Sequence, residues 1–345
     1  MVSLTWTSQP APDQTAQALA LLAASGSVDG VYPVSEPVLL RLRHRRPGDH
    51  LLAQDGDGAL VGYAALDTRT GRPTAELAVH PDHRRRGIGG ALASTLVERV
   101  GVGLWMWSHG EHPGALALAK RHGMHRAREL WQFRRSLDEL ASHRPLPAGL
   151  HLRTFVPGRD EAAVVEVNNR AFAWHPEQAD WDVEQLAVRE DEPWFDPTGF
   201  LLAVNGQGRL LGFHWTKVHP DGVGEVYVLG IDPDAQGSGL GSALIAAGLE
   251  HLAGRGLEEV LLYVESDNEA AKRMYEKIGF RHHHTDVAFL YKNRSHTGCF
   301  GPLGHDHWIG RPPERGMGHH LSGGQFTSCS RDLESASILI AYPPR

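Results

Sequence analysis

Cysteine is scarce in this sequence: Cys299 and Cys329 are the only two among 345 residues, and both lie near its C-terminal end. A disulfide framework and a cysteine-based zinc site are therefore excluded. No apolar run approaches the roughly 20 residues of a membrane span, and the first ten residues lack the apolar centre of a signal peptide. We accordingly expect a cytoplasmic protein with no membrane partner.

Basic residues are fewer than acidic residues. Lys and Arg number 34 against 41 Asp and Glu, which gives a formal net charge of −7. Nucleic acid is not expected as a partner, because phosphate binding requires a basic surface. Hydrophobic residues make up 41% and charged residues 22%, as in ordinary globular proteins. At roughly 100–200 residues per domain, the length predicts two domains.

The sequence contains an internal duplication. Residues 77–92 read LAVHPDHRRRGIGGAL, and residues 229–244 read LGIDPDAQGSGLGSAL. A proline, two glycines and the surrounding apolar residues keep one register, which chance rarely produces. A second match follows in each copy, AKRHGM at 119–124 and YEKIGF at 275–280. Each copy is therefore expected to fold as a similar unit that ends in a final strand.

The boundary between the copies is expected near residue 145, where an RPLP stretch favours extended chain. This gives domains at 1–143 and 150–294. Hydrophobic periodicity in the second copy predicts mixed α/β architecture. The expected strands are 200–204, 209–218, 224–231, 260–265 and 287–292, and the expected helices are 160–172, 239–253 and 268–278. The remaining residues, 295–345, are rich in Gly, Pro and His without steady periodicity, so we expect a disordered tail.

Each copy has a glycine-rich turn between a strand and a helix. Glycine lets the backbone approach an anion closely, and N–H groups at a helix start complement negative charge. Ordinary turns also use glycine, so the turn alone is a weak signal. The dinucleotide-binding alternative requires G-x-G-x-x-G and an acidic residue about 20 positions further on. Neither copy has that spacing, so nicotinamide binding is not expected.

The wider motif resembles that of the GCN5-related N-acetyltransferases. Arg84-x-x-Gly87-x-Gly89 and Gln236-x-x-Gly239-x-Gly241 fit the family signature Q/R-x-x-G-x-G/A, and residues 268–280, NEAAKRMYEKIGF, resemble a second family segment. The resemblance implies two tandem domains, each with a mixed, mostly antiparallel sheet flanked by helices. It also implies acetyl-CoA as co-substrate, with its pyrophosphate at the glycine-rich turn.

Longer segments are similar to the mycothiol synthase family, which consists of tandem acetyltransferases. They are VSEPVLLRLR (34–43), NNRAFAWHPEQADW (168–181), EVYVLGIDPDAQGSGLG (225–241) and LLYVESDNEAA (261–271). The resemblance implies acetylation of the cysteinyl amine of desacetylmycothiol, a glucosaminyl-inositol, as the last step of mycothiol biosynthesis. Two alternatives stay open. One is acetylation of another primary amine, in an aminoglycoside or a peptide, and the other is a non-catalytic acetyl-CoA-sensing module. We expect a monomer in each case.

The same resemblance implies which residues contact each substrate. Acetyl-CoA contacts in the first copy would be Leu77, Ala78, Val79, Arg85, Arg86, Gly87, Ile88, Gly89 and Gly90. In the second copy they would be Leu229, Gly230, Ile231, Gln236, Gly237, Ser238, Gly239, Leu240, Gly241, Ser242, Asn268, Glu269, Ala270, Ala271, Lys272 and Arg273. The amine substrate would contact Glu36, Glu177, Lys217, Glu225 and Tyr263.

Four of these five substrate contacts also have a purely structural interpretation. Glu36 could be a first-turn acid after a Ser35 N-cap, which is a common helix start. Glu177 could be a solvated loop carboxylate, and Lys217 an exposed strand lysine. Tyr263 alternates with Leu261 and Glu265, so it could belong to the core.

Catalysis is expected in the second copy. Glu225 is the candidate base for the amine proton, and Tyr275 is the candidate hydrogen-bond donor to the leaving thiolate. The ungapped alignment places Ala119 opposite Tyr275 and Pro73 opposite Glu225. The first copy is therefore expected to bind acetyl-CoA without reacting and to contribute Glu36. No metal is expected, because the consecutive histidines at 282–284 cannot all face one ion from a strand.

Overall fold

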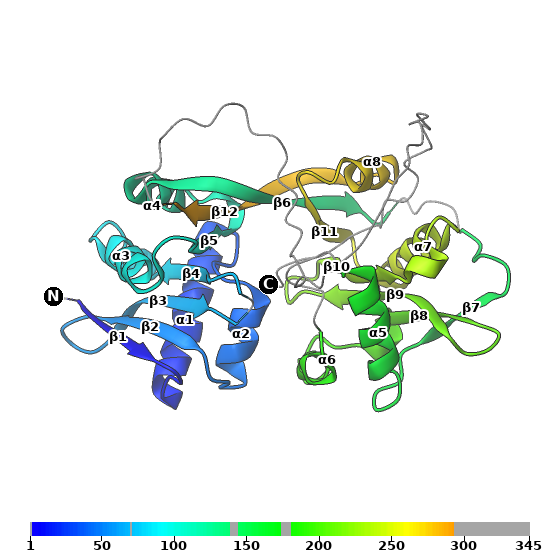
Figure 1. Cartoon of the computed structure of the whole chain (residues 1–345), viewed down its shortest axis with the longest axis horizontal. Helices are drawn as coiled ribbons and strands as arrows, with labels where there is room; N and C mark the ends of the chain where they lie inside the picture. Colours follow the sequence, from blue (N-terminus) through cyan, green and yellow to red (C-terminus); the bar gives the residue numbers. More distant parts are fainter. Residues whose placement is uncertain (1, 70, 139–143, 174–180, 293–345) are drawn as a thin grey trace, which may run out of the picture.

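The computed structural model describes residues 2–69, 71–138, 144–173 and 181–292 (Figure 1). Glu177 and the expected tail at 295–345 lie outside this part of the chain. Within it, none of the helices combines the length and the apolar character needed to cross a bilayer.

Strands and helices alternate in the same order in both halves. Among the described residues the strands are β1 (Ser3–Thr7), β2 (Asp49–Gln54), β3 (Leu60–Asp67), β4 (Thr74–Val79), β5 (Trp105–Ser108), β6 (Met124–Ser136), β7 (Leu150–Thr154), β8 (Phe200–Asn205), β9 (Leu210–Val218), β10 (Gly224–Ile231), β11 (Glu259–Glu265) and β12 (Arg281–Tyr291). The helices are α1 (Pro12–Asp29), α2 (Glu36–Arg43), α3 (Ile88–Val100), α4 (Pro113–His122), α5 (Glu161–Ala171), α6 (Val183–Glu190), α7 (Leu240–Gly254) and α8 (Glu269–Lys277). Short 3-10 turns are η1 (Pro81–His83), η2 (His109–Glu111), η3 (Pro197–Gly199) and η4 (Pro233–Ala235).

Helices cover both faces of the sheet because side chains along its strands alternate between two cores. On β3, Tyr63 and Ala65 pack with α1 and α2, while Ala64 and Leu66 pack with α3. In the second half, α5 and α6 cover one face of β8–β10 and α7 covers the other. The expected α/β class with mostly antiparallel sheets flanked by helices is confirmed.

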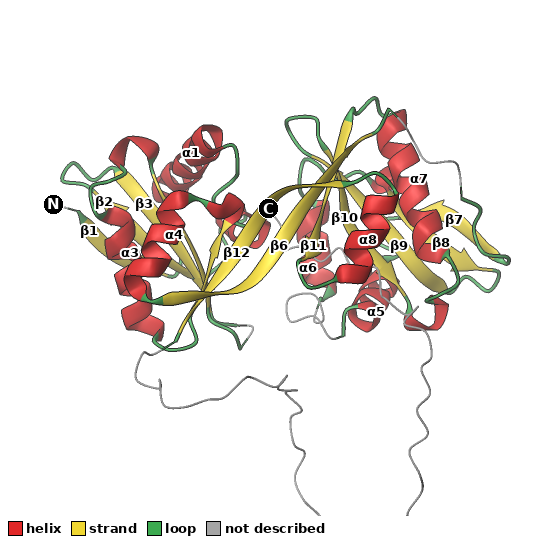
Figure 2. Cartoon of the chain, turned by 90° about the horizontal axis from the view of Figure 1, so that it is seen from above, coloured by secondary structure: helices red, strands yellow, loops and turns green. Residues whose placement is uncertain are grey.

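The two halves exchange their final strands. The sheet order is β1-β2-β3-β4-β5-β12-β6-β11-β10-β9-β8-β7. Thus β12 pairs with β5 of the first half, and β6 pairs with β11 of the second half. Figure 2 shows β6 and β12 running together from one lobe to the other. A single sheet of twelve strands therefore joins the two halves among the described residues.

This exchange is what the sequence did not predict. A final strand was expected at 287–292, but β12 begins at Arg281, six residues earlier. Residues 281–286, RHHHTD, are polar and carry no apolar alternation. They are extended because β6 pairs with them along this stretch. The pattern of one strand says which side chains are buried, but it does not say which strand lies beside it.

Each half contains a pair of parallel strands that pair only at one end. The ladder between β10 and β11 consists of Gly224–Val260 and Glu225–Leu261, and that between β4 and β5 consists of Thr74–Trp105 and Ala75–Met106. Beyond these pairs the strands diverge. The edge of β10 that leads to the glycine-rich turn is therefore available to an extended ligand.

The strand exchange predicts that an engineered disulfide can join the two halves. Ser136 on β6 and Glu259 on β11 are direct antiparallel partners, so their Cα atoms lie about 4.5–5.5 Å apart. That separation is within the range of about 4.4–6.8 Å for disulfides. A Ser136→Cys, Glu259→Cys variant, with Cys299→Ser and Cys329→Ser, should form this bond on oxidation.

The readout is a non-reducing gel after cleavage at a protease site inserted within 139–143. The two fragments should stay linked until a reductant is added, whereas each single-cysteine variant should separate. Separation of the oxidised double variant would show that β6 does not lie beside β11.

Candidate active site

The two glycine-rich turns have the same backbone conformation. Gly87 and Gly239 are the N-caps of α3 and α7, and both have a φ of 86°. Two residues earlier, Arg85 and Gly237 also have positive φ, at 63° and 73°. A non-glycine residue in this region is uncommon and costs energy. The first half therefore retains the turn's shape even where arginine makes it unfavourable.

Both turns fit a pyrophosphate group. The first helical hydrogen bonds run from Ala91 N to Gly87 O and from Ala243 N to Gly239 O. The N–H groups that precede them point out of each helix and can donate to an anion. A Cβ placed on Gly87 or Gly239 would meet no atom within 4 Å, so the space in front of each turn is open. Glycine is needed there for its backbone conformation.

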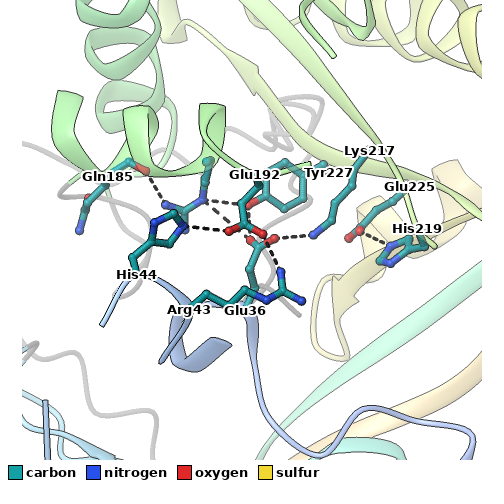
Figure 3. A network of polar contacts seen from close by, with 10 residues as sticks. Glu36, Arg43, His44, Gln185, Glu192, Lys217, His219, Glu225 and Tyr227 are labelled. Atoms are coloured by element: carbon teal, nitrogen blue, oxygen red, sulfur yellow. Dashed lines mark hydrogen bonds and ion pairs between the residues drawn. The ribbon is translucent and has the colours of Figure 1, made fainter. Parts of the chain in front are cut away.

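A buried polar cluster lies between the two halves (Figure 3). Glu36 on α2 forms an ion pair with Lys217 on β9 and accepts a hydrogen bond from the Tyr227 hydroxyl on β10. Arg189 on α6 donates from Nε to the Tyr227 hydroxyl at 2.8 Å and lies 3.9 Å from Glu36 Oε2. Glu36 and Lys217 are only 2% and 5% exposed, although each comes from a different half. These two predicted substrate contacts are therefore brought together.

Burial and the Glu36 carboxylate raise the pKa of Tyr227 well above its ordinary value, although Arg189 opposes the shift. The phenol is therefore protonated at neutral pH and donates to Glu36 while accepting from Arg189. Lys217 also lies over the Trp194 ring, with Nζ 4.4 Å from its centroid. The buried cluster between the halves thus combines aromatic and charged groups.

Helix α2 holds Glu36 in place from the first half. Ser35 is the N-cap and Glu36 is the first helical residue, as the sequence allowed. The backbone N–H of Ser35 donates to Glu76 Oε2 on β4 at 2.5 Å, which fixes the helix start. At the other end, Arg43 and His44 contact the Glu192 carboxylate of the second half at 2.6 and 2.9 Å. Both ends of α2 are therefore anchored.

A β-bulge in β10 changes the direction in which the Tyr227 side chain points. Val226 pairs with Thr216 and Val228 pairs with Trp215, so Tyr227 falls between consecutive partners on β9. Bulges of this kind are common next to active sites.

The extra residue at this bulge also corrects the ungapped alignment of the two halves. Glu225 pairs with Lys217 as Thr74 pairs with Asp67, so the counterpart of Glu225 in the first half is Thr74 and not Pro73.

Glu225 lies on the same face of β10 as the cluster, 1% exposed. It is the direct cross-strand partner of Lys217. Its Oε2 is 2.7 Å from Nε2 of His219, the first residue after β9 (Figure 3). The carboxylate therefore stands where the pairing of β10 with β11 ends, next to Lys217 and His219.

Tyr275 lies on α8 within the core that also contains Phe280. It is fully buried, and among the described residues its hydroxyl has no hydrogen-bond partner. Burial raises its pKa well above the ordinary value, so the group stays protonated. A phenol of this kind can donate a hydrogen bond but loses its proton with difficulty. Ala119, on α4, occupies the corresponding place in the first half.

Two other predicted residues have clear local roles. Tyr263 on β11 is fully buried and accepts a hydrogen bond from Gln132 Nε2 on β6 at 2.6 Å. This contact between the halves exists because of the strand exchange. Asn268 is the N-cap of α8, as predicted, and accepts from Ala271 N at 3.0 Å. In the described part of the chain, no group of three or more His, Cys, Asp or Glu side chains could hold a metal ion.

Four residues of the site were not predicted from the sequence: Tyr227, Arg189, Glu192 and His219. Continuing the period-two alternation of β9 by one residue could have found His219, which follows Lys217 by two positions and lies directly after the strand. The bulge hides Tyr227 from that rule. Arg189 lies on α6 and Glu192 follows that helix. This helix was not predicted from the sequence, and no motif marks either residue.

Two family models match the chain. The Acetyltransferase (GNAT) domain matches residues 46–124, and the Acetyltransferase (GNAT) family matches residues 166–280. The chain is also similar to the solved structure of a tandem GNAT protein from the clavulanic acid biosynthesis pathway, with a TM-score of 0.63 over 84% of this chain and 98% of that one. Their identity of 21% supports the fold alone. The class of protein is thus a tandem N-acetyltransferase.

Curated relatives are more specific. The chain is 49% identical to a mycothiol acetyltransferase of Saccharopolyspora erythraea, over 79% of this chain and 99% of the relative. It is 52% identical to one of Actinosynnema mirum, over 84% of this chain and 99% of the relative. The chain belongs to the mycothiol acetyltransferase family, and it is an N-acetyltransferase of the kind that uses acetyl-CoA as co-substrate.

A second buried network holds the start of α2. His109 Nδ1 is 2.9 Å from Asp286 Oδ2 on β12, and His109 Nε2 is 3.7 Å from Glu76 Oε2. Burial alone would lower the pKa of His109, but the two carboxylates outweigh burial and raise it to about 9. The imidazole is therefore charged at neutral pH. It links the exchanged strand to the carboxylate that holds the start of α2.

This network predicts a pH-dependent stability. Because the pKa of His109 is raised to about 9 in the folded state, its contribution is complete below about pH 6.5 and is lost as the pH rises through 9. The loss should reach about 3 kcal/mol. Urea unfolding at pH 6.5 and pH 9 should show a smaller decrease for His109→Gln than for the wild type. Equal decreases would contradict the assignment.

Proposed function

We propose that the second half, residues 150–294, acetylates the cysteinyl amine of desacetylmycothiol with acetyl-CoA, as the last step of mycothiol biosynthesis. One observation carries this proposal: the buried Glu225 carboxylate lies where β10 and β11 diverge, directly opposite Lys217 and on the strand that leads to the glycine-rich turn. An amine held by the Glu36 cluster would be next to this base.

The substrate chemistry fits the cluster. Desacetylmycothiol carries many hydroxyl groups and one primary amine, for which carboxylates and a lysine are suitable partners. We assign Glu36, Lys217 and Tyr263 to substrate binding, together with Glu225. Glu177 belongs to this set by family resemblance and lies outside the described residues. Because Glu36 and Lys217 contact each other, the substrate has to replace part of their ion pair when it binds.

Glu225 acts as the base in this proposal. An α-amine has an ordinary pKa of about 7.7–8.0 and is mostly protonated at neutral pH, so its proton must be removed before attack. A backbone N–H from Leu229, Gly230 or Ile231 polarises the thioester carbonyl. Tyr275 donates a hydrogen bond to the developing thiolate. Full proton transfer from Tyr275 is disfavoured, because burial raises its pKa while a thiol has a pKa of about 8.5.

The first half, residues 1–143, has a supporting role. Its turn at Leu77, Ala78, Val79 and residues 85–90 binds acetyl-CoA without chemistry, since Thr74 and Ala119 stand where Glu225 and Tyr275 lie in the second half. Its contribution to the reaction is Glu36. In the second half, acetyl-CoA contacts the residues at 229–231, 236–242 and 268–273. The enzyme works as a cytoplasmic monomer on a small molecule and uses no metal, nucleic acid or membrane.

The test of this function is thiol release from acetyl-CoA with a panel of amines. Desacetylmycothiol should be acetylated with a higher kcat/KM than an aminoglycoside, a peptide amine or free cysteine. Glu225→Gln should abolish the reaction, because an amide cannot accept the proton. Equal rates with another amine would reject the proposed substrate, and absence of thiol release with every amine would favour an acetyl-CoA-sensing role.

Tyr275→Phe should reduce kcat by about 10- to 1000-fold, the scale of acid catalysis. The KM for acetyl-CoA should change little. Because the hydroxyl has no hydrogen-bond partner among the described residues, its removal should not lower the melting temperature. Single-turnover rates and thermal melts measure both effects. A wild-type single-turnover rate would remove Tyr275 from the mechanism.

Gly87 and Gly239 offer a matched test of the two halves, because both have a φ of 86° and open space in front. Glutamate adds the same backbone strain and the same negative charge at either turn. Gly239→Glu should abolish thiol release, whereas Gly87→Glu should retain substantial activity with saturating amine. The control is that both variants show cooperative melting. The reverse result would assign the reaction to the first half.

A further inference from the structure

Glu225 has to dispose of a proton in every turnover, and it is only 1% exposed. The ammonium form of the substrate loses one proton, the amine then forms the C–N bond, and the C–S bond breaks. The second proton of the nitrogen ends on the thiol of coenzyme A. One proton per turnover must therefore reach solvent from a buried carboxylate.

His219 is placed to carry that proton. Its Nε2 is 2.7 Å from Glu225 Oε2, and its side chain is 15% exposed. One end of the imidazole thus contacts the buried carboxylate, while part of the side chain reaches the surface. Histidine has an ordinary pKa of about 6.5 and can gain and lose a proton near neutral pH. The neighbouring residue on the outer side, Pro220, is exposed.

The turn between β9 and β10 holds His219 firmly. Its backbone N–H donates to Val223 O at 2.9 Å, and its carbonyl accepts from Gly222 N at 2.9 Å. Gly222 has a φ of 84°, which favours glycine. The turn is closed further by Val223 N, which donates to Asp221 Oδ1 at 3.3 Å. A short turn closed by three hydrogen bonds therefore holds the backbone of His219, whose imidazole contacts Glu225.

Charged groups surround this pair on one face. Lys217 is the cross-strand partner of Glu225, and its ammonium group is engaged by Glu36. Asp221 lies in the turn next to His219. Lys217 is 5% exposed, and so less accessible than His219. His219 thus both contacts Glu225 directly and reaches the surface, whereas Lys217 is buried.

We propose that His219 is the proton relay from the catalytic base Glu225 to solvent. It acts through Glu225 and does not touch the substrate, so its role is to reset and orient the base. This inference rests on the proposed function of Glu225. It adds a residue that neither the sequence motifs nor the family resemblance singled out.

The experiment separates relay from orientation by using two substitutions in the full chain. His219→Gln retains an N–H donor that can reach Glu225 but cannot carry a proton, while His219→Ala removes both. If His219 is a relay, both variants should lose at least about 10-fold in kcat for thiol release with saturating amine. The KM for acetyl-CoA should stay within about two-fold, since the relay does not touch the glycine-rich turn.

Rescue provides the decisive readout. Added imidazole should restore kcat of His219→Ala in a concentration-dependent way and leave the wild type unchanged. The matched control is His151→Ala, which removes an exposed histidine on β7 and should behave as the wild type. Wild-type kcat in His219→Gln would overturn the relay, and so would a low kcat in His219→Ala that imidazole does not restore.

Glu225→Gln distinguishes failure of this inference from failure of the proposed function. With Glu225 as the base, that variant should be inactive at every imidazole concentration. If Glu225→Gln is inactive while His219→Gln has wild-type kcat, only the relay is rejected. If Glu225→Gln is itself active, the base has been misassigned and the relay is rejected with it.

Discussion

The pairing of β6 with strands of the other half is the constraint on which the rest of the structure depends. β6 lies between β12 and β11, so it is enclosed by two strands of the second half. Backbone groups in such a ladder require partners, because burying them unpaired is costly. The Glu36–Lys217 pair could not join the halves by itself, since burying two charges offsets most of their attraction. The shared sheet places the halves, and the ion pair forms as a consequence.

Local features of the fold could be predicted from the sequence, and neighbour relations could not. The turn at Gly239, the cap at Asn268 and the strand at 224–231 depend on residues close in the chain, and each was found where predicted. The exchange of β6 and β12 depends on which strand edges meet in space. The alternation of side chains along β12 would be the same for any neighbouring strand. Its polar first half, residues 281–286, gave no signal at all.

The site shows the same division between local and distant information. Family resemblance was needed to single out Glu36 and Lys217, because neither residue belongs to a sequence motif that indicates a catalytic or binding role. The bulge at Tyr227 shifts the register by one residue, so an ungapped alignment compared Glu225 with Pro73 when its counterpart is Thr74. Arg189 reaches the cluster from α6, which shows no motif. Such residues become visible only when three elements are placed together.

The two halves share a backbone design but use their buried charges differently. Their glycine-rich turns agree closely in φ because few residues tolerate that conformation. On the strands that lead to those turns, side chains are free to differ. In the first half, Glu76 and His109 hold the start of α2, while in the second half Glu225 faces the opening beside β11. The Glu76 carboxylate of the first half therefore fixes the start of α2, from which Glu36 reaches Lys217 of the second half.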